Sequence, residues 1–218
     1  MKKLGRPRDQ DLASRRREEI LEAATKLFAR HGYQGTDVQT VADILEVGKG
    51  TIYRYFPSKE KLFLASVDRG MRLLSERIDE KVTDLGDPLK QFVRAVQAYL
   101  EFFETHPDLV ELLIQERAAF RDRKKPTYFE HRDANIDRWK GILEQFIDSR
   151  RAREIPVNRI LDVVTDLLYG TIFTNYFARP ARSLEAQASD LLDIVLNGIL
   201  ADKNDRGDTR RHDPEDAP

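Results

Sequence analysis

The sequence has no cysteine, no long apolar run and only four histidines among its 218 residues. The absence of cysteine excludes disulfide bonds and thiolate chemistry, and it agrees with a reducing cytoplasm. No apolar run approaches the ~20 residues that a membrane-spanning helix needs, and a polar stretch follows the basic N-terminus where a signal peptide would be apolar. We therefore expect a cytoplasmic protein that has no membrane partner.

Patterns that carry catalysis are absent as well. The histidines are scattered without metal-ligand spacing, at His31, His106, His131 and His212. The sequence contains no phosphate-binding glycine loop, no nucleophile elbow and no paired acid and base groups. These absences predict a protein that is not an enzyme and that holds neither a metal nor a cofactor.

Charge is unevenly distributed along the chain. The formal net charge is −1, but residues 1–61 contain 13 Lys and Arg against 9 Asp and Glu, whereas the remainder contains 24 against 29. A basic first quarter and an acidic remainder indicate one face for DNA and a separate part for another role. A chance asymmetry gives the same numbers, so the motifs have to decide between these two explanations.

The stretch from Val47 to Phe63, VGKGTIYRYFPSKEKLF, has the composition of a helix that reads a DNA groove. Ile52 and Phe56 are four residues apart, so a helix stacks them on its inner face. Pro57 ends this helix, and Ser58 can cap the next one. The outer face then presents cations and hydroxyl groups, which suit phosphates and base edges. The candidate DNA contacts are Lys49 and Arg54 at base edges, Thr51, Tyr53, Tyr55 and Lys59 at phosphates, and the backbone of Gly50.

Together with Val41-Ala42, this stretch resembles the DNA-binding signature of the TetR family of transcriptional regulators. The resemblance covers roughly Arg15 to Leu62. Two positions depart from the family pattern. Glu46 stands where the turn between the two helices usually has glycine, and Gly48 stands where the recognition helix usually begins with a Ser or Thr cap. Glycine is an acceptable cap at a cost of a few tenths of a kcal/mol.

Periodicity predicts an all-α fold with an N-terminal three-helix, helix-turn-helix DNA-binding domain over residues 13–62. We expect residues 1–12 to form a flexible basic arm that either lies in a minor groove or makes only loose phosphate contacts. A helix over 13–30 should end at Gly32, and Thr36 with Gln39 reads as a capping box for the next helix. Thr36 and Gln39 are secondary candidates for DNA contacts.

A larger helical domain for ligand binding and dimerisation is expected over residues 82–203. A long helix over 58–81 should join it to the DNA-binding domain, because Phe63, Val67 and Met71 begin an apolar stripe along it. Residues 204–218 are charged and contain Gly and Pro, which is typical of a disordered tail.

Two predicted helices, one starting at Pro156 and one after Ser183, are apolar around most of their circumference. Helices of this kind are buried by more than one neighbour. They either close the chain's own core or form a four-helix bundle with a second copy, and the TetR resemblance implies the bundle. The candidate interface residues are Leu161, Val164, Leu168, Leu191, Leu192, Val195 and Ile199. Such a homodimer would place two recognition helices on a palindromic operator in double-stranded DNA.

The larger domain is rich in aromatic residues, and the TetR resemblance implies that it holds an unidentified small-molecule effector. The candidate ligand-binding residues are Phe92, Tyr99, Phe103, Phe120, Trp139, Phe146, Tyr169 and Phe173. They suit an apolar or aromatic molecule, but a packed core explains the same residues. Polar residues interrupt the apolar stripes at several places, Glu116, His131 and Asn135 among them, where a satisfied core or surface group is the more common explanation.

The leading hypothesis is a dimeric repressor that a small apolar or aromatic ligand releases from its operator. An activator, or a regulator without a small-molecule ligand, is the alternative within the same class. An all-α enzyme or carrier is the third hypothesis. The cations and hydroxyl groups on the outer face of residues 49–55 argue against this third hypothesis.

Overall fold

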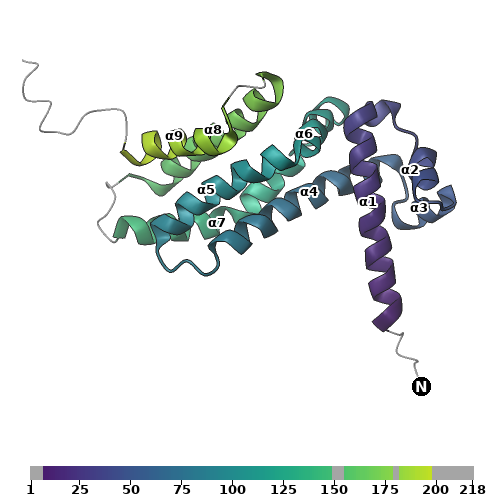
Figure 1. The fold of residues 1–218 in the computed structure, drawn as a ribbon, viewed down its shortest axis with the longest axis horizontal. Coiled ribbons are helices and arrows are strands. Elements are labelled where there is room, and N and C mark those ends of the chain that lie inside the picture. Colours follow the sequence, from purple (N-terminus) through teal and green to yellow (C-terminus); the bar gives the residue numbers. More distant parts are fainter. Residues whose placement is uncertain (1–6, 149–154, 179–181, 198–218) are drawn as a thin grey trace, which may run out of the picture.

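The computed structural model describes residues 7–148, 155–178 and 182–197, and these ranges contain nine helices and no strand. The helices are α1 (Pro7–Gly35), α2 (Val38–Ile44), α3 (Lys49–Tyr55), α4 (Lys59–Val82), α5 (Pro88–Thr105), α6 (Pro107–Ala119), α7 (Thr127–Asp148), α8 (Val157–Ala178) and α9 (Leu184–Asn197). None of these described helices is both long enough and apolar enough to cross a membrane. The prediction of an all-α fold is confirmed (Figure 1).

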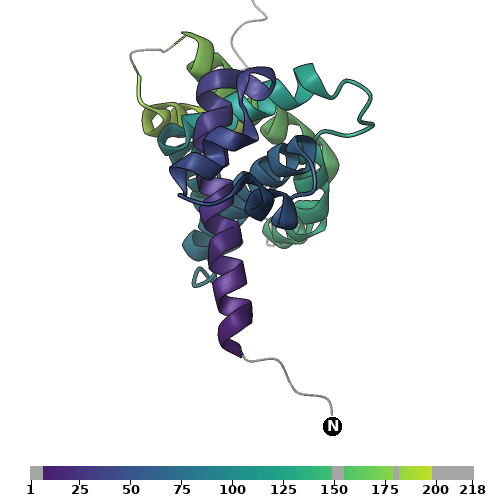
Figure 2. The ribbon, with the colours of Figure 1, turned by 90° about the vertical axis from the view of Figure 1, so that its right-hand side faces the viewer.

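The first helix starts earlier than its predicted start at residue 13. Because α1 begins at Pro7, the expectation of a flexible arm over residues 1–12 is wrong for residues 7–12, and residues 1–6 lie outside the described ranges. Proline is compatible with the first position of a helix, where its missing N–H would have no partner anyway. Gly32 has a φ of 77° and interrupts α1, as the predicted terminal glycine should. Both views show the N-terminal part of α1 extending beyond the rest of the fold (Figures 1 and 2).

The helices α2 and α3 form the predicted helix-turn-helix. The cap of α2 is Asp37 and not Thr36, because the Asp37 carboxylate accepts a hydrogen bond from the backbone N–H of Gln39 at 2.8 Å. Glu46 in the turn has a φ of 53°, the left-handed conformation that favours glycine. The recognition helix α3 has the predicted bounds, Lys49–Tyr55.

The long helix α4 connects the helix-turn-helix to the larger helical part. Its predicted cap, Ser58, accepts a hydrogen bond from the backbone N–H of Lys61 at 3.1 Å. α4 packs against α1, α5 and α7, and α6 packs against both α1 and α4 (Figure 1). One contiguous apolar core extends from Ile20 on α1 to Leu192 on α9. The two parts of the chain are therefore in direct mechanical contact through α4 and α6.

A buried carboxylate orders the connection between α6 and α7. Glu116 on α6 accepts hydrogen bonds from the backbone N–H of Thr127 at 3.0 Å and from its hydroxyl at 2.8 Å, and the guanidinium of Arg123 lies 3.5 Å away. The carboxylate thus satisfies a donor at the start of α7 that has no partner within that helix. This agrees with the interpretation of Glu116 as a satisfied core group.

Candidate functional site

The recognition helix is held by its inner face and is open on its outer face. Ile52 and Phe56 are buried in the core, as their spacing predicts. Tyr53 is 40% exposed, and Arg54 and Gly50 are also exposed. Seen from the side of the helix-turn-helix, α2 and α3 lie in front of the rest of the fold (Figure 2). This outer face is therefore accessible to a large partner such as a DNA duplex.

Lys49 at the start of α3 is paired with the cap of α2. Its ammonium lies 2.9 Å from the carboxylate of Asp37. The backbone N–H of Gln39, and then Lys49, lower the pKa of Asp37, whereas Asp37 raises the pKa of Lys49. Both groups are consequently charged near neutral pH. A phosphate that arrives at this surface would compete with Asp37 for the ammonium of Lys49.

The remaining basic and aromatic candidates lie beside this pair. Lys59 donates a hydrogen bond to the backbone carbonyl of Gln34 at 3.0 Å, and its ammonium is 4.9 Å from the centre of the Tyr33 ring. The guanidinium of Arg54 is 5.4 Å from the centre of the Tyr55 ring, which packs partly against the core. These contacts hold both cations close to the surface of the domain, in positions that suit phosphates.

Two candidates from the capping box have different surroundings. Gln39 is exposed, and its amide donates a hydrogen bond to the carboxylate of Asp43 at 2.7 Å. Thr36 is only 3% exposed, and its hydroxyl donates to the carbonyl oxygens of Gly32 at 2.8 Å and Leu27 at 3.2 Å. The prediction of Thr36 as a DNA contact is therefore wrong: its side chain closes the connection between α1 and α2.

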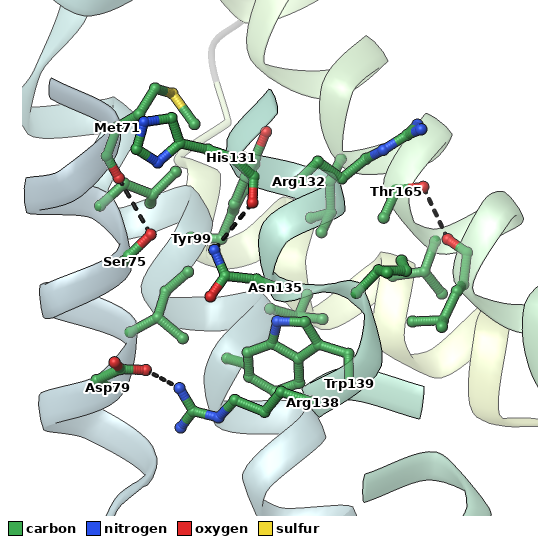
Figure 3. A pocket seen from close by; sticks show the side chains of 18 of the residues that line it. Met71, Ser75, Asp79, Tyr99, His131, Arg132, Asn135, Arg138, Trp139 and Thr165 are labelled. Atoms are coloured by element: carbon green, nitrogen blue, oxygen red, sulfur yellow. Dashed lines mark hydrogen bonds and ion pairs between the residues drawn. The ribbon is translucent and has the colours of Figure 1, made fainter. Parts of the chain in front are cut away.

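A cavity of about 130 Å³ lies between α4, α5, α7 and α8 (Figure 3). Three of the predicted ligand-binding residues line it, namely Phe92, Tyr99 and Trp139. The other apolar lining side chains come from all four helices, with Met71, Leu74 and Ile78 of α4 and Leu168 of α8 among them. The apolar stripe of α4 is visible in the sequence, but periodicity alone does not tell which part of a buried stripe borders a void.

The other five aromatic candidates do not line this cavity. Phe120 packs between Tyr33 and Phe63, with ring centroids 4.9 Å and 5.6 Å apart. Phe103 packs on Tyr99 and Phe102, Tyr169 and Phe173 pack on each other, and Phe146 is half-buried on α7. These five residues lie outside the lining of this cavity, because an aromatic side chain fills a core as readily as it lines a pocket, and their role as ligand contacts stays a prediction.

Polar groups enter the cavity wall at a few points. The hydroxyl groups of Tyr99 and Tyr128 are 3.0 Å apart, and burial raises the pKa of Tyr128 to about 12. Asn135 donates to the backbone carbonyl of His131 at 2.9 Å, and Arg138 pairs with Asp79. Figure 3 shows the Arg138–Asp79 pair to the left of the ring of Trp139. An apolar wall with a few oriented polar groups is the usual design of a small-molecule site.

A chain of charged contacts joins the cavity wall to the DNA-binding part. The Nε2 atom of His131 is 2.8 Å from the carboxylate of Asp68 on α4, and Arg72 contacts the same carboxylate at 3.2 Å. Arg72 also lies 3.8 Å from Glu18 on α1, and Arg69 binds Glu18 at 2.7 Å. The wall of the cavity is thus connected through α4 to the helix that packs beneath the helix-turn-helix. In the sequence His131 is only a polar interruption of an apolar stripe, because its partner Asp68 is 63 residues away.

The structure assigns most of the predicted dimer residues to the chain's own core. Leu161, Val164, Leu168 and Leu192 are buried, Leu191 and Val195 are partly buried against the core, and Ile199 lies outside the described ranges. The first four predictions are therefore wrong for a dimer interface. Other apolar residues of the same two helices are exposed, namely Val163, Leu167, Phe177, Ile194 and Leu196. A helix that is apolar on nearly all sides does not reveal in sequence which face turns inward.

Comparisons with known proteins agree with this geometry. The family model described as "Bacterial regulatory proteins, tetR family" matches residues 20–66. The chain is 40% identical over 191 residues to the HTH-type transcriptional regulator YhgD of Bacillus subtilis, across 85% of this chain and 97% of that protein. The chain belongs to the TetR family. This TetR-family chain is also 27% identical over 188 residues to the HTH-type transcriptional repressor KstR2 of Mycobacterium tuberculosis, across 84% of this chain and 92% of that protein.

A solved structure supports the same fold for the TetR-family chain. The transcriptional regulator FadR from Bacillus subtilis, solved in complex with stearoyl-CoA, superposes with a TM-score of 0.69 at 20% identity, across 84% of this chain and 99% of that one. The matched family model ends inside α4, beyond the recognition helix. The chain is thus a DNA-binding transcriptional regulator with a helix-turn-helix at its N-terminal end.

Proposed function

We propose that the chain is a homodimeric repressor that a small molecule releases from a palindromic operator. The observation that carries this proposal is the position of α4. The helix follows directly on the recognition helix, and its other end lines the apolar cavity. A ligand that fits the cavity in only one position of α4 shifts the equilibrium between two arrangements of the DNA-binding part.

The exposed apolar residues of α8 and α9 supply the dimer interface in this proposal. Phe177 is 69% exposed and Ile194 is 54% exposed, although both are large apolar side chains. Large apolar side chains that stay exposed on both α8 and α9 are typical of a protein–protein interface. A twofold pairing through this face gives a four-helix bundle and carries two recognition helices to successive major grooves, ~34–36 Å apart.

The outer face of α3 reads and grips the operator. Arg54 suits a guanine edge, and Lys49 reaches either a base edge or a phosphate once Asp37 releases it. Tyr53, Tyr55 and Lys59 suit phosphates and set the register of the helix in the groove. A regulator of this kind acts on chromosomal DNA in the cytoplasm, and the proposal requires no catalytic step.

The small-molecule part of the proposal rests on the cavity and on the fold neighbour. FadR from Bacillus subtilis holds stearoyl-CoA, so this fold is able to carry an effector. A coupling of ~1–3 kcal/mol, or ~5–150-fold in affinity, is the usual scale for such a response. This coupling is enough to vacate an operator at a moderate concentration of ligand.

The test is binding to the DNA that flanks the protein's own gene, measured by fluorescence anisotropy over a series of salt concentrations. We expect tighter binding than to random DNA, a steep salt dependence, and weaker binding by Tyr53→Ala. Equal binding by Tyr53→Ala would contradict the assignment of that residue. If the wild-type protein bound neither this flanking DNA nor any fragment selected from the genome more tightly than random DNA, the repressor proposal would be contradicted.

The dimer is tested separately by sedimentation. Leu167→Glu places a charge on the exposed face of α8 and should shift the protein to monomers and weaken operator binding. Leu12→Glu is the matched control for sedimentation, because Leu12 is also an exposed leucine but belongs to α1. A dimer that is unaffected by Leu167→Glu would show that another face forms the interface.

A further inference from the structure

A basic recess of about 530 Å³ lies where α6 ends and α7 begins. Its walls come from the end of α6, the connection to α7, the first turns of α7 and one residue of α8. Six cationic residues line it: Arg117, Arg121, Arg123, Lys124, Lys125 and Arg132. In the described part of the chain no Asp or Glu belongs to this lining. Residues 62–218 contain 24 Lys and Arg against 29 Asp and Glu, so this concentration of positive charge runs against the composition around it.

Carboxylates outside the lining hold three of the six cations in place. Arg123 lies 3.5 Å from the buried carboxylate of Glu116 and 3.0 Å from that of Glu130. The carboxylate of Asp133 pairs with the other two, Lys125 and Arg132. These pairs fix the frame of the recess and leave its remaining polar groups without an acid.

Four donors of the recess have no acidic partner. The guanidinium of Arg117 donates to a backbone carbonyl, that of Arg121, at 3.2 Å. Within the described ranges, the side chains of Arg121 and Lys124 have neither a hydrogen-bond nor an ion-pair partner. The hydroxyl of Tyr169, which is half-buried in the wall, likewise has no hydrogen-bond partner there. The end of α6, the connection and α8 therefore each supply at least one such donor.

This set of donors has the chemistry of an oxyanion site. Guanidinium groups match the oxygen atoms of phosphate and carboxylate groups, and such charge-assisted hydrogen bonds are the strong ones. Three unpaired like charges around one recess repel each other, and an anion with more than one negative charge removes that repulsion. A monovalent anion would leave most of it in place. The lining thus favours a multivalent anion.

The recess lies next to the contact between α6 and the DNA-binding part. The amide of Gln115 on α6 donates to the backbone carbonyl of Phe28 on α1 at 2.9 Å. Phe120, directly after α6, packs on Tyr33 with the ring centroids 4.9 Å apart. An anion in the recess would therefore join α6, its connection and α8 beside the place where α6 braces α1.

We propose that the recess is a second ligand site, separate from the apolar cavity, that binds a compact multivalent oxyanion. The anion is held by Arg117, Arg121 and Lys124 and accepts a hydrogen bond from the hydroxyl of Tyr169. Phosphate groups and several carboxylates on one small molecule share this chemistry. The inference does not depend on the proposed function, because neither the apolar cavity nor an operator enters it.

Calorimetric titration of the full chain, without DNA and at constant ionic strength, tests the inference. The probes are inorganic pyrophosphate, tricarballylate and acetate. We expect both multivalent anions to bind and acetate to show no binding. Tighter binding of pyrophosphate would assign the site to phosphate groups, and tighter binding of tricarballylate would assign it to carboxylates; either result supports the site.

Variants of the exposed cations locate the binding. Arg121→Gln/Lys124→Gln should weaken the tighter of the two anions about tenfold. Both side chains are exposed and unpaired in the described ranges, so the fold should be unaffected. The control Lys81→Gln/Lys90→Gln removes the same charge from α4 and α5, outside the recess, and should bind like the wild type.

A second variant tests the wall and not the charge. Tyr169→Phe keeps the ring that packs on Phe129 and Phe173 and removes only the hydroxyl. It should weaken the anion about fivefold. An unchanged affinity would overturn the assignment of the hydroxyl.

Three results would overturn the site itself. The first is no binding of either multivalent anion. The second is equal weakening by the two double variants, which would show a general effect of net charge. The third is a loss of DNA affinity in Arg121→Gln/Lys124→Gln when neither anion binds the wild type, which would make the recess a contact for the DNA backbone.

Discussion

Gly70 of α4 faces Leu109 of α6, so a substitution at this position tests how tightly the two helices pack. A Cβ atom at this position would lie 2.4 Å from Cδ1 of Leu109 and 3.1 Å from its Cγ. Leu109 is itself buried, so its side chain has little room to turn away. Gly70→Ala should therefore overpack the contact between α4 and α6.

The expected magnitude comes from two opposing effects. Overpacking of a core costs about 1–3 kcal/mol, and the short contact favours the upper part of that range. Replacing a glycine inside a helix by alanine returns about 1 kcal/mol. We expect a net loss of about 1–2 kcal/mol, which corresponds to a fall in Tm of roughly 3–6 °C for a chain of this length.

Thermal unfolding followed by circular dichroism measures this loss, at one fixed protein concentration because the Tm of the proposed dimer would depend on concentration. Gly141→Ala on α7 is the matched control, since a Cβ atom there meets nothing within 4 Å. It should raise Tm by a few degrees. If Gly70→Ala also raised Tm, the close packing of α4 on α6 would be refuted.

Three further changes test other parts of the structure. Asp37→Asn keeps a side chain that caps α2 but frees Lys49, so operator affinity measured by anisotropy should rise several-fold; unchanged affinity would show that Lys49 does not meet DNA. Glu116→Gln weakens the bonds to Thr127 and should lower the free energy of unfolding in urea by about 1–3 kcal/mol, with an unaltered slope. The pKa of Tyr128 is raised to about 12 by burial, above its unfolded value of about 10, so stability should be lost as the pH rises from about 10 through 12. Tyr128→Phe should reduce this loss in the free energy of unfolding by about 3 kcal/mol. If the variant lost as much stability as the wild type over this pH range, the burial of the Tyr128 hydroxyl would be contradicted.

Local signals in the sequence were sufficient for the helix-turn-helix. The spacing of Ile52 and Phe56, the proline at position 57 and the cap at Ser58 each act within one or two turns, and the bounds of α3 agree with them. The start of α1 could not be predicted in this way, because a basic stretch with a proline suits an arm as well as the first position of a helix.

Properties that depend on the packing of distant helices could not be predicted. Thr36 has the chemistry of a cap, yet its hydroxyl is bound to carbonyl oxygens of α1. Leu161 and Leu167 are equally apolar members of α8, and the packing of α8 against α5, α6 and α7 decides that the first is buried and the second exposed. The cavity depends on four helices at once, which explains why three aromatic candidates line it and five do not.

The length of α4 has a geometric consequence for the proposed release from the operator. Between Lys59 and Ile78, which lines the cavity, the helix is about 29 Å long at 1.5 Å per residue. A lever of this length needs to rotate by only about 7° to displace its far end by ~3.4 Å, the spacing of successive base pairs. A cavity that expands by a fraction of a side chain can thus move a recognition helix out of step with the groove by one full base pair.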